Sequence, residues 1–211
     1  MNETVEKATL PRDKIFRLLE LFLVFSVGVY VFVNPFPHRT AIENLSLYLS
    51  MITLLALLAY RKIDFSIKNP LSMPLFLFAI WAFTGLFFAF NLKNSVHYIY
   101  AHLVKYLIFF YLLVNCYASE KRFVALIWII VASTSIYAAG TMVFDYVILG
   151  HPVTTKLGFY VHDSYKGVIP SNLVSVPTLF GLLLAINQFS HSTDKYQRIA
   201  LLICICILCT A

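Results

Sequence analysis

Long continuous stretches of apolar residues alternate along the chain with short polar connections. A helix needs roughly 20 apolar residues to cross a hydrocarbon core of about 30 Å, because each residue rises about 1.5 Å. The apolar positions do not alternate in the way that barrel strands require. The pattern predicts an all-α fold, a polytopic integral membrane helical bundle with about seven transmembrane helices, at roughly 15–33, 42–60, 71–90, 98–118, 123–149, 171–189 and 199–211.

The composition excludes a soluble protein. Of the 211 residues, 60% are hydrophobic and only 12% are charged, whereas a soluble domain carries about a quarter of charged residues to keep its surface wetted. The same figures exclude a disordered chain, a coiled coil and a disulfide-rich secreted scaffold. We therefore expect lipid to cover most of the surface.

The positive residues are distributed unequally between alternate connections. Because Lys and Arg stay on the cytoplasmic side, the richer set predicts a cytoplasmic N-terminus. The poorer set, on the outer side, consists of Arg39, Lys93, Lys156 and Lys166. The richer set consists of Lys7, Arg12, Lys14, Arg17, Arg61, Lys62, Lys68, Lys121, Arg122, Lys195 and Arg198.

The chain is expected to comprise a cytoplasmic N-terminal segment, 1–14, and a transmembrane helical domain, 15–211, with an outer-face loop at 150–170. The first apolar run is too long for a signal peptide and no cleavage site follows it, so it is expected to be retained. The last run covers only about thirteen residues from Ile199. We therefore expect the last helix to be truncated and the chain to be the front part of a longer protein.

Lys105 lies within the fourth predicted span, where an ammonium group costs about 2.5 to 3.5 kcal/mol on insertion scales. At helical spacing Tyr98, His102 and Lys105 share one face. Two interpretations stay open. Lys105 either extends to the outer headgroups, about two turns away, or it is paired or functional inside the bundle.

The outer loop 150–170 contains Lys156 and Lys166, its only basic residues, together with His151, His162, Asp163 and Tyr165. A lysine supplies a strong point charge for a phosphate or pyrophosphate. The loop is therefore a candidate substrate-binding segment. The alternative is a solvated connection between two helices.

Two further patterns favour structural roles. Thr134, Ala138, Thr141 and Asp145 form a small and polar stripe on one face of the fifth span, which is typical of a helix-packing seam. Cys204 and Cys206 differ by about 200° around a helix, so they do not converge on a metal ion. We expect no metal site and no cofactor.

Three short patterns resemble those of one family of membrane enzymes. They are the fourth-span pattern Asn94-Ser95 followed by His102-Leu103-Val104-Lys105-Tyr106, the turn 118–122, and the stretch 165–172, which joins the outer loop to the next span. Together with the layout of the spans, these patterns resemble the N-terminal part of the O-antigen ligase and O-antigen polymerase family, which includes lipid A-core:surface polymer ligases. The resemblance extends over nearly all of the chain.

The resemblance implies a glycosyltransferase in lipopolysaccharide biosynthesis, located in the bacterial inner (cytoplasmic) membrane. The donor would be a polyprenyl-pyrophosphate-linked glycan, and the acceptor lipid A-core or a growing glycan, at the periplasmic face. The reaction would be metal-independent, with cationic groups stabilising the pyrophosphate. The substrate-binding candidates are Lys166, Lys105, His102, Asn172 and Lys156. Lys166 stands where the family has an arginine, which would bind phosphate in a bidentate manner.

The catalytic residues are expected beyond Ala211, in a large periplasmic loop with a histidine, so the chain alone is expected to be inactive. His151 and His162 are not assigned that role. Three alternatives to a ligase stay open: an O-antigen polymerase, a glycolipid transporter or flippase, and a non-catalytic membrane scaffold. The expected partners are the lipid bilayer, the glycan donor and the acceptor, without nucleic acid.

Overall fold

The computed structural model describes residues 3–36, 39–148, 150 and 171–210, and within them every regular element is helical. In chain order the helices are α1 (Glu3–Val33), α2 (Thr40–Ala59), α3 (Ser72–Thr84), α4 (Leu92–Tyr98), α5 (Lys105–Cys116), α6 (Glu120–Met142), α7 (Ser171–His191) and α8 (Lys195–Thr210). A 3₁₀ turn, η1 (Gly85–Phe88), follows α3, and two π-helical stretches, η2 (Ile99–Val104) and η3 (Val143–Ile148), extend α4 and α6. The all-helical prediction is confirmed for the described residues.

Four helical stretches in this part of the chain are long and apolar enough to cross a membrane. They are Lys14–Val33, Thr40–Ala59, Leu92–Cys116 and Glu120–Ile148. Helices also occupy the other three predicted segments, where α3 with η1 forms a shorter apolar helix, Ser72–Phe88. Large apolar side chains such as Trp81, Phe87 and Phe88 are exposed, as expected for surfaces that contact lipid. These features indicate a multi-pass membrane protein.

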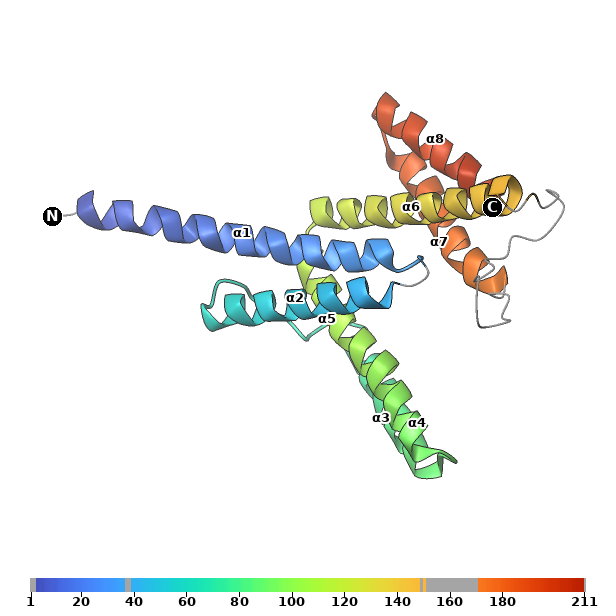
Figure 1. The fold of residues 1–211 in the computed structure, drawn as a ribbon. Coiled ribbons are helices and arrows are strands. Elements are labelled where there is room, and N and C mark those ends of the chain that lie inside the picture. Colours follow the sequence, from blue (N-terminus) through green and yellow to red (C-terminus); the bar gives the residue numbers. More distant parts are fainter. Residues whose placement is uncertain (1–2, 37–38, 149, 151–170, 211) are drawn as a thin grey trace. The chain divides into compact units, whose positions relative to one another are not determined.

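The chain divides into two compact units. Unit 1 comprises Met1–Val27 and Asn44–Ser119, and unit 2 comprises Gly28–Glu43 and Glu120–Ala211. In unit 1, α3 and η1 contact the continuous α4–η2–α5 helix, and the two lie side by side in Figure 1. In unit 2, α6, α7 and α8 pack against one another.

Short polar side chains join α1 and α2 in unit 1. Ser26 of α1 donates a hydrogen bond from its hydroxyl to the carbonyl oxygen of Ser46 on α2, at 2.8 Å. On α2, Ser46, Ser50 and Thr53 are buried, and Ser50 and Thr53 donate back to carbonyls one turn earlier. Small hydroxyl side chains allow helices to approach closely in lipid. The tip of α5 is fixed to α1 by the Tyr117 hydroxyl, which donates to the carbonyl of Val24.

The predicted packing seam on α6 is confirmed for three of its four residues. Thr134, Ala138 and Thr141 are buried, and a Cβ placed on Gly181 of α7 would overlap the Thr134 side chain, 2.8 Å from its Cβ. Asp145, the fourth residue, lies in the π-helical stretch η3. The seam therefore brings α7 directly onto α6, around a core that includes Val131, Ala185 and Leu201.

Candidate functional site

The spanning helix Leu92–Cys116 is interrupted by the π-helical turn η2, Ile99–Val104. A π-helical turn hydrogen-bonds i to i+5 and is wider than an α-helical turn, and such turns occur frequently at functional sites. His102 lies inside this turn, and Lys105 is the first residue of the α-helix that follows. The structure thus places two of the five candidate residues at one irregularity in a spanning helix.

His102 lies between two tyrosine rings. Its imidazole stacks on Tyr98 with ring centroids 5.7 Å apart and planes at 16°, and on Tyr106 with centroids 6.2 Å apart and planes at 28°. All three side chains are exposed within the chain. The stack orients the imidazole and leaves it accessible on one side of the helix.

Lys105 is half-buried. Its alkyl stem can lie along apolar surface while the ammonium group reaches a polar ligand. The pairing of Tyr98 with His102 was predicted from helical spacing, and the structure adds Tyr106, which that prediction omitted. The signal was present in the sequence, because Tyr98, His102 and Tyr106 recur at intervals of four residues.

The other three candidates are placed less completely. Lys156 and Lys166, with the whole 151–170 part of the predicted outer loop, lie outside the described residues. Asn172 lies in the first turn of α7, in unit 2. Of the five candidates, the structure therefore brings only His102 and Lys105 together.

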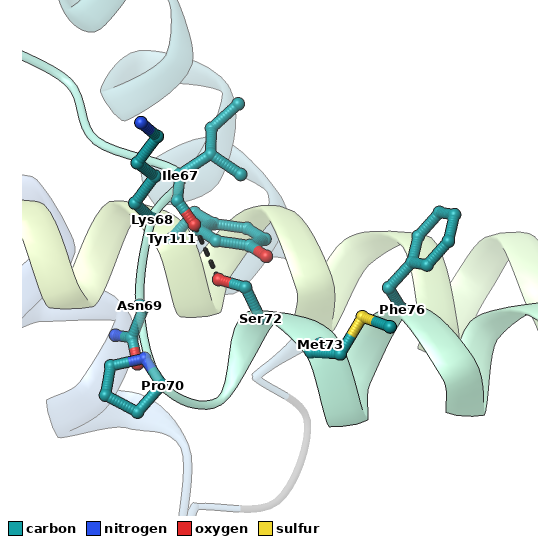
Figure 2. Close-up of a pocket in the computed structure, with 8 residues that line it drawn as sticks. All are labelled: Ile67, Lys68, Asn69, Pro70, Ser72, Met73, Phe76 and Tyr111. Carbon is teal, nitrogen blue, oxygen red and sulfur yellow. Dashed lines mark hydrogen bonds between the residues drawn. The ribbon is translucent and has the colours of Figure 1, made fainter.

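A second feature of unit 1 is a groove of about 650 Å³ at the start of α3, shown in Figure 2. It is bordered by Lys68 and Asn69 in the turn before α3, by Met73 and Phe76 on α3, and by Tyr111 on α5. In the figure the side chains of Met73 and Phe76 continue from the turn along α3. Its lining is largely apolar, which suits a hydrocarbon ligand better than a sugar.

The turn at this groove is attached to α5 by a side-chain amide. The backbone N–H of Ser66 donates to Oδ1 of Asn115 at 2.8 Å, and Nδ2 of Asn115 donates to the Ser66 carbonyl at 3.0 Å. Ser72 closes the turn by donating to the Ile67 carbonyl (Figure 2). Asn115 therefore fixes the position of the 66–72 segment, and sequence reasoning gave no signal for it.

Within the described residues, no group of three or more His, Cys, Asp or Glu side chains is arranged to hold a metal ion. Comparisons of the chain with models of protein families, with curated proteins and with solved structures find no match.

Proposed function

We propose that this chain belongs to a glycosyltransferase of the O-antigen ligase type in a bacterial inner membrane. It would transfer a polyprenyl-pyrophosphate-linked glycan to lipid A-core or a related acceptor at the periplasmic face. The proposal includes seven transmembrane helices with a cytoplasmic N-terminus. It is supported by the residue patterns around 94–106, 118–122 and 165–172 and by the multi-pass helical architecture.

The observation that carries the proposal is the position of His102 and Lys105 at the π-helical turn η2. A cationic residue within a spanning segment is costly and by default indicates a ligand or a partner. A pyrophosphate group is the chemical feature of the donor that a lysine ammonium group stabilises best. The accessible Tyr98–His102–Tyr106 stack provides polar and aromatic surface beside that charge.

In the transfer step, the acceptor hydroxyl oxygen bonds to the anomeric carbon of the donor glycan as the bond from that carbon to the pyrophosphate oxygen breaks. The hydroxyl proton leaves to a base, and the electron pair of the broken bond leaves with the polyprenyl pyrophosphate. Lys105 would stabilise the negative charge that develops on the departing pyrophosphate. Lys166 and Lys156 would add positive charge from the outer loop, and Asn172 a hydrogen-bonding amide.

The distribution of Lys and Arg between alternate connections supports the seven-helix topology. Under this topology the Leu92 end of the Leu92–Cys116 helix faces the periplasm. The π-helical turn η2, which starts seven residues further on at Ile99, would then lie in the outer half of the membrane. This is the depth at which a lipid-linked pyrophosphate would meet a membrane enzyme.

The test reconstitutes the full-length protein to which this chain belongs in proteoliposomes, together with a polyprenyl-pyrophosphate-linked oligosaccharide and lipid A-core. Products are separated by gel and identified by mass spectrometry. We expect glycosylated lipid A-core together with released polyprenyl pyrophosphate. Lys105→Met should reduce the rate by about tenfold or more, corresponding to at least about 1.4 kcal/mol of transition-state stabilisation, and the exposed Lys121→Met should leave it unchanged.

Three outcomes would contradict the proposal. Lengthened glycan on the polyprenyl carrier would identify a polymerase instead. Movement of the intact donor across the bilayer without a new glycosidic bond would identify a transporter. If the protein neither transfers nor moves the glycan, and binds neither the donor nor the acceptor, a non-catalytic scaffold would be left.

A further inference from the structure

Residues 16–20 of α1 and the C-terminal end of α2 border a small polar pocket in unit 1 that is separate from the η2 site. It has a volume of about 270 Å³ and is lined by Phe16, Arg17 and Glu20 of α1, and by Leu57, Lys62 and Ile63 of α2 and the turn after it. Two cations and one carboxylate therefore meet at a pocket with an apolar floor.

The turn after α2 positions Lys62 for this pocket. Arg61 adopts a left-handed conformation with φ of 51°. Its N–H donates to the Leu58 carbonyl at 2.9 Å, and the Lys62 N–H donates to the Leu57 carbonyl at 3.0 Å. This is the Schellman pattern, in which glycine usually occupies the left-handed position. The turn reverses the chain, so that Lys62 comes back against α1.

Aromatic rings hold the cation in place. The Lys62 ammonium group lies 5.0 Å from the centroid of the Phe16 ring, within the range of a cation–π interaction. The Phe16 ring in turn packs against the Tyr60 ring, with centroids 5.3 Å apart. Phe16 and Tyr60 therefore hold the Lys62 side chain at one side of the pocket.

The pocket lies at the ends of two apolar stretches. Lys14 begins the first candidate span and Ala59 ends the second, so in a bilayer these two ends lie near the level of the lipid headgroups. Basic pockets at this level bind acidic lipid headgroups.

We propose that this pocket binds the headgroup of an anionic phospholipid with a single phosphodiester, such as phosphatidylglycerol. The phosphodiester would lie between Arg17 and Lys62, and a headgroup hydroxyl would donate to the Glu20 carboxylate. The lining carries two positive charges and one negative charge, so a headgroup with one negative charge neutralises it. The site is independent of the proposed glycan transfer.

The test uses the purified chain in micelles containing equal amounts of phosphatidylglycerol, phosphatidylethanolamine and phosphatidylcholine, with retained lipid counted by native mass spectrometry. We expect one phosphatidylglycerol to be retained preferentially. The double variant Arg17→Met with Lys62→Met keeps a long, unbranched side chain at each position and removes both positive charges. It should lower phosphatidylglycerol retention by about tenfold or more.

The matched control is Lys121→Met with Lys195→Met, which removes the same charge from two exposed positions outside the pocket. It should retain phosphatidylglycerol as the unmodified chain does, and circular dichroism should show equal helix content in all three proteins. Equal retention of the three lipids would overturn the proposal. So would preferential retention of phosphatidylethanolamine, or a phosphatidylglycerol preference that persists without Arg17 and Lys62.

Discussion

Gly181 allows α7 to lie directly against Thr134 of α6, because a side chain at this position would occupy the space of the threonine. In lipid, where apolar surface gains little from leaving the solvent, close packing of small residues supplies much of the attraction between helices. The hydroxyl of Thr134 is satisfied within its own helix by the carbonyls of Ile130 and Val131. The contact therefore depends on shape rather than on a hydrogen bond between helices.

Replacing Gly181 by alanine should destabilise the contact between α6 and α7. We expect Gly181→Ala to cost about 1 to 3 kcal/mol, the usual range for overpacking, measured as a shift in unfolding of the purified protein by sodium dodecyl sulfate in mixed micelles. Gly140→Ala on α6 is the control, because nothing lies within 4 Å of a Cβ placed there. Equal stability of the two variants would show that the α6–α7 contact is not formed.

Arg39 and Glu43 show how a carboxylate is accommodated at the start of a spanning helix. Nε of Arg39 lies 2.6 Å from Oε1 of Glu43, one helical turn away, and the Glu43 side chain is buried. A buried carboxylate needs such a partner, because desolvation of an unpaired charge is costly. The distribution of positive residues predicts that Arg39 lies on the outer side, but it does not indicate the ion pair with Glu43.

At the scale of elements, the hydrophobic pattern predicted all seven helical positions. The length and apolarity of a span are local properties, so the pattern reports them directly. It did not predict the 3₁₀ and π-helical stretches η1, η2 and η3, because their departure from α-helical hydrogen bonding is not a difference in hydrophobicity. The ends of helices also differ from the prediction by several residues, and α1 begins at Glu3 rather than near Ile15.

The candidate site was predicted only in part, for the same reason. His102 and Lys105 stand out in the sequence because they are polar residues within an apolar run. The stack on Tyr106 also had a signal in the sequence, the interval of four residues from His102, which the prediction did not use, whereas the π-helical turn depends on backbone geometry. Asn115, which holds the Ser66 backbone, acts across 49 residues of chain, a separation that no local pattern reports.

Deleting Ala101 from η2 should convert the π-helical turn into a regular α-helix, because a π-helical turn accommodates one extra residue within a helix. We expect the helix content measured by circular dichroism to be retained. Binding of a polyprenyl pyrophosphate should fall by about tenfold or more, since the wider turn that holds His102 next to Lys105 is lost. Lys121→Met, an exposed change outside this helix, is the control and should leave this binding unchanged. Unchanged binding after loss of Ala101 would contradict a role for the turn.

At the scale of the whole molecule, four helices in the described part of the chain have the length and apolarity to cross a membrane, and each compact unit has buried side chains that hold its helices together. Much of the remaining surface is apolar and exposed, which a soluble protein does not tolerate over large areas. These features indicate a multi-pass membrane protein. The proposed topology adds that the N-terminus lies on the cytoplasmic side of the membrane.

The topology predicts opposite sides of the membrane for the two ends of the Leu92–Cys116 helix. In a background with the four native cysteines replaced by alanine, Asn94→Cys should react with a membrane-impermeant maleimide from the periplasmic side. Ser119→Cys should react only after permeabilisation. Labelling of both positions from one side would show that this helix does not span, and the reverse pattern would contradict the cytoplasmic N-terminus.

The most direct test of the central claim is equilibrium binding of a polyprenyl pyrophosphate to the purified chain in nanodiscs of neutral lipid. The account predicts that the pyrophosphate binds more tightly than the corresponding polyprenyl alcohol. It also predicts that Lys105→Met weakens pyrophosphate binding by about tenfold or more, while Lys121→Met does not. Equal affinity for the pyrophosphate and the alcohol, or full affinity without the Lys105 charge, would contradict it.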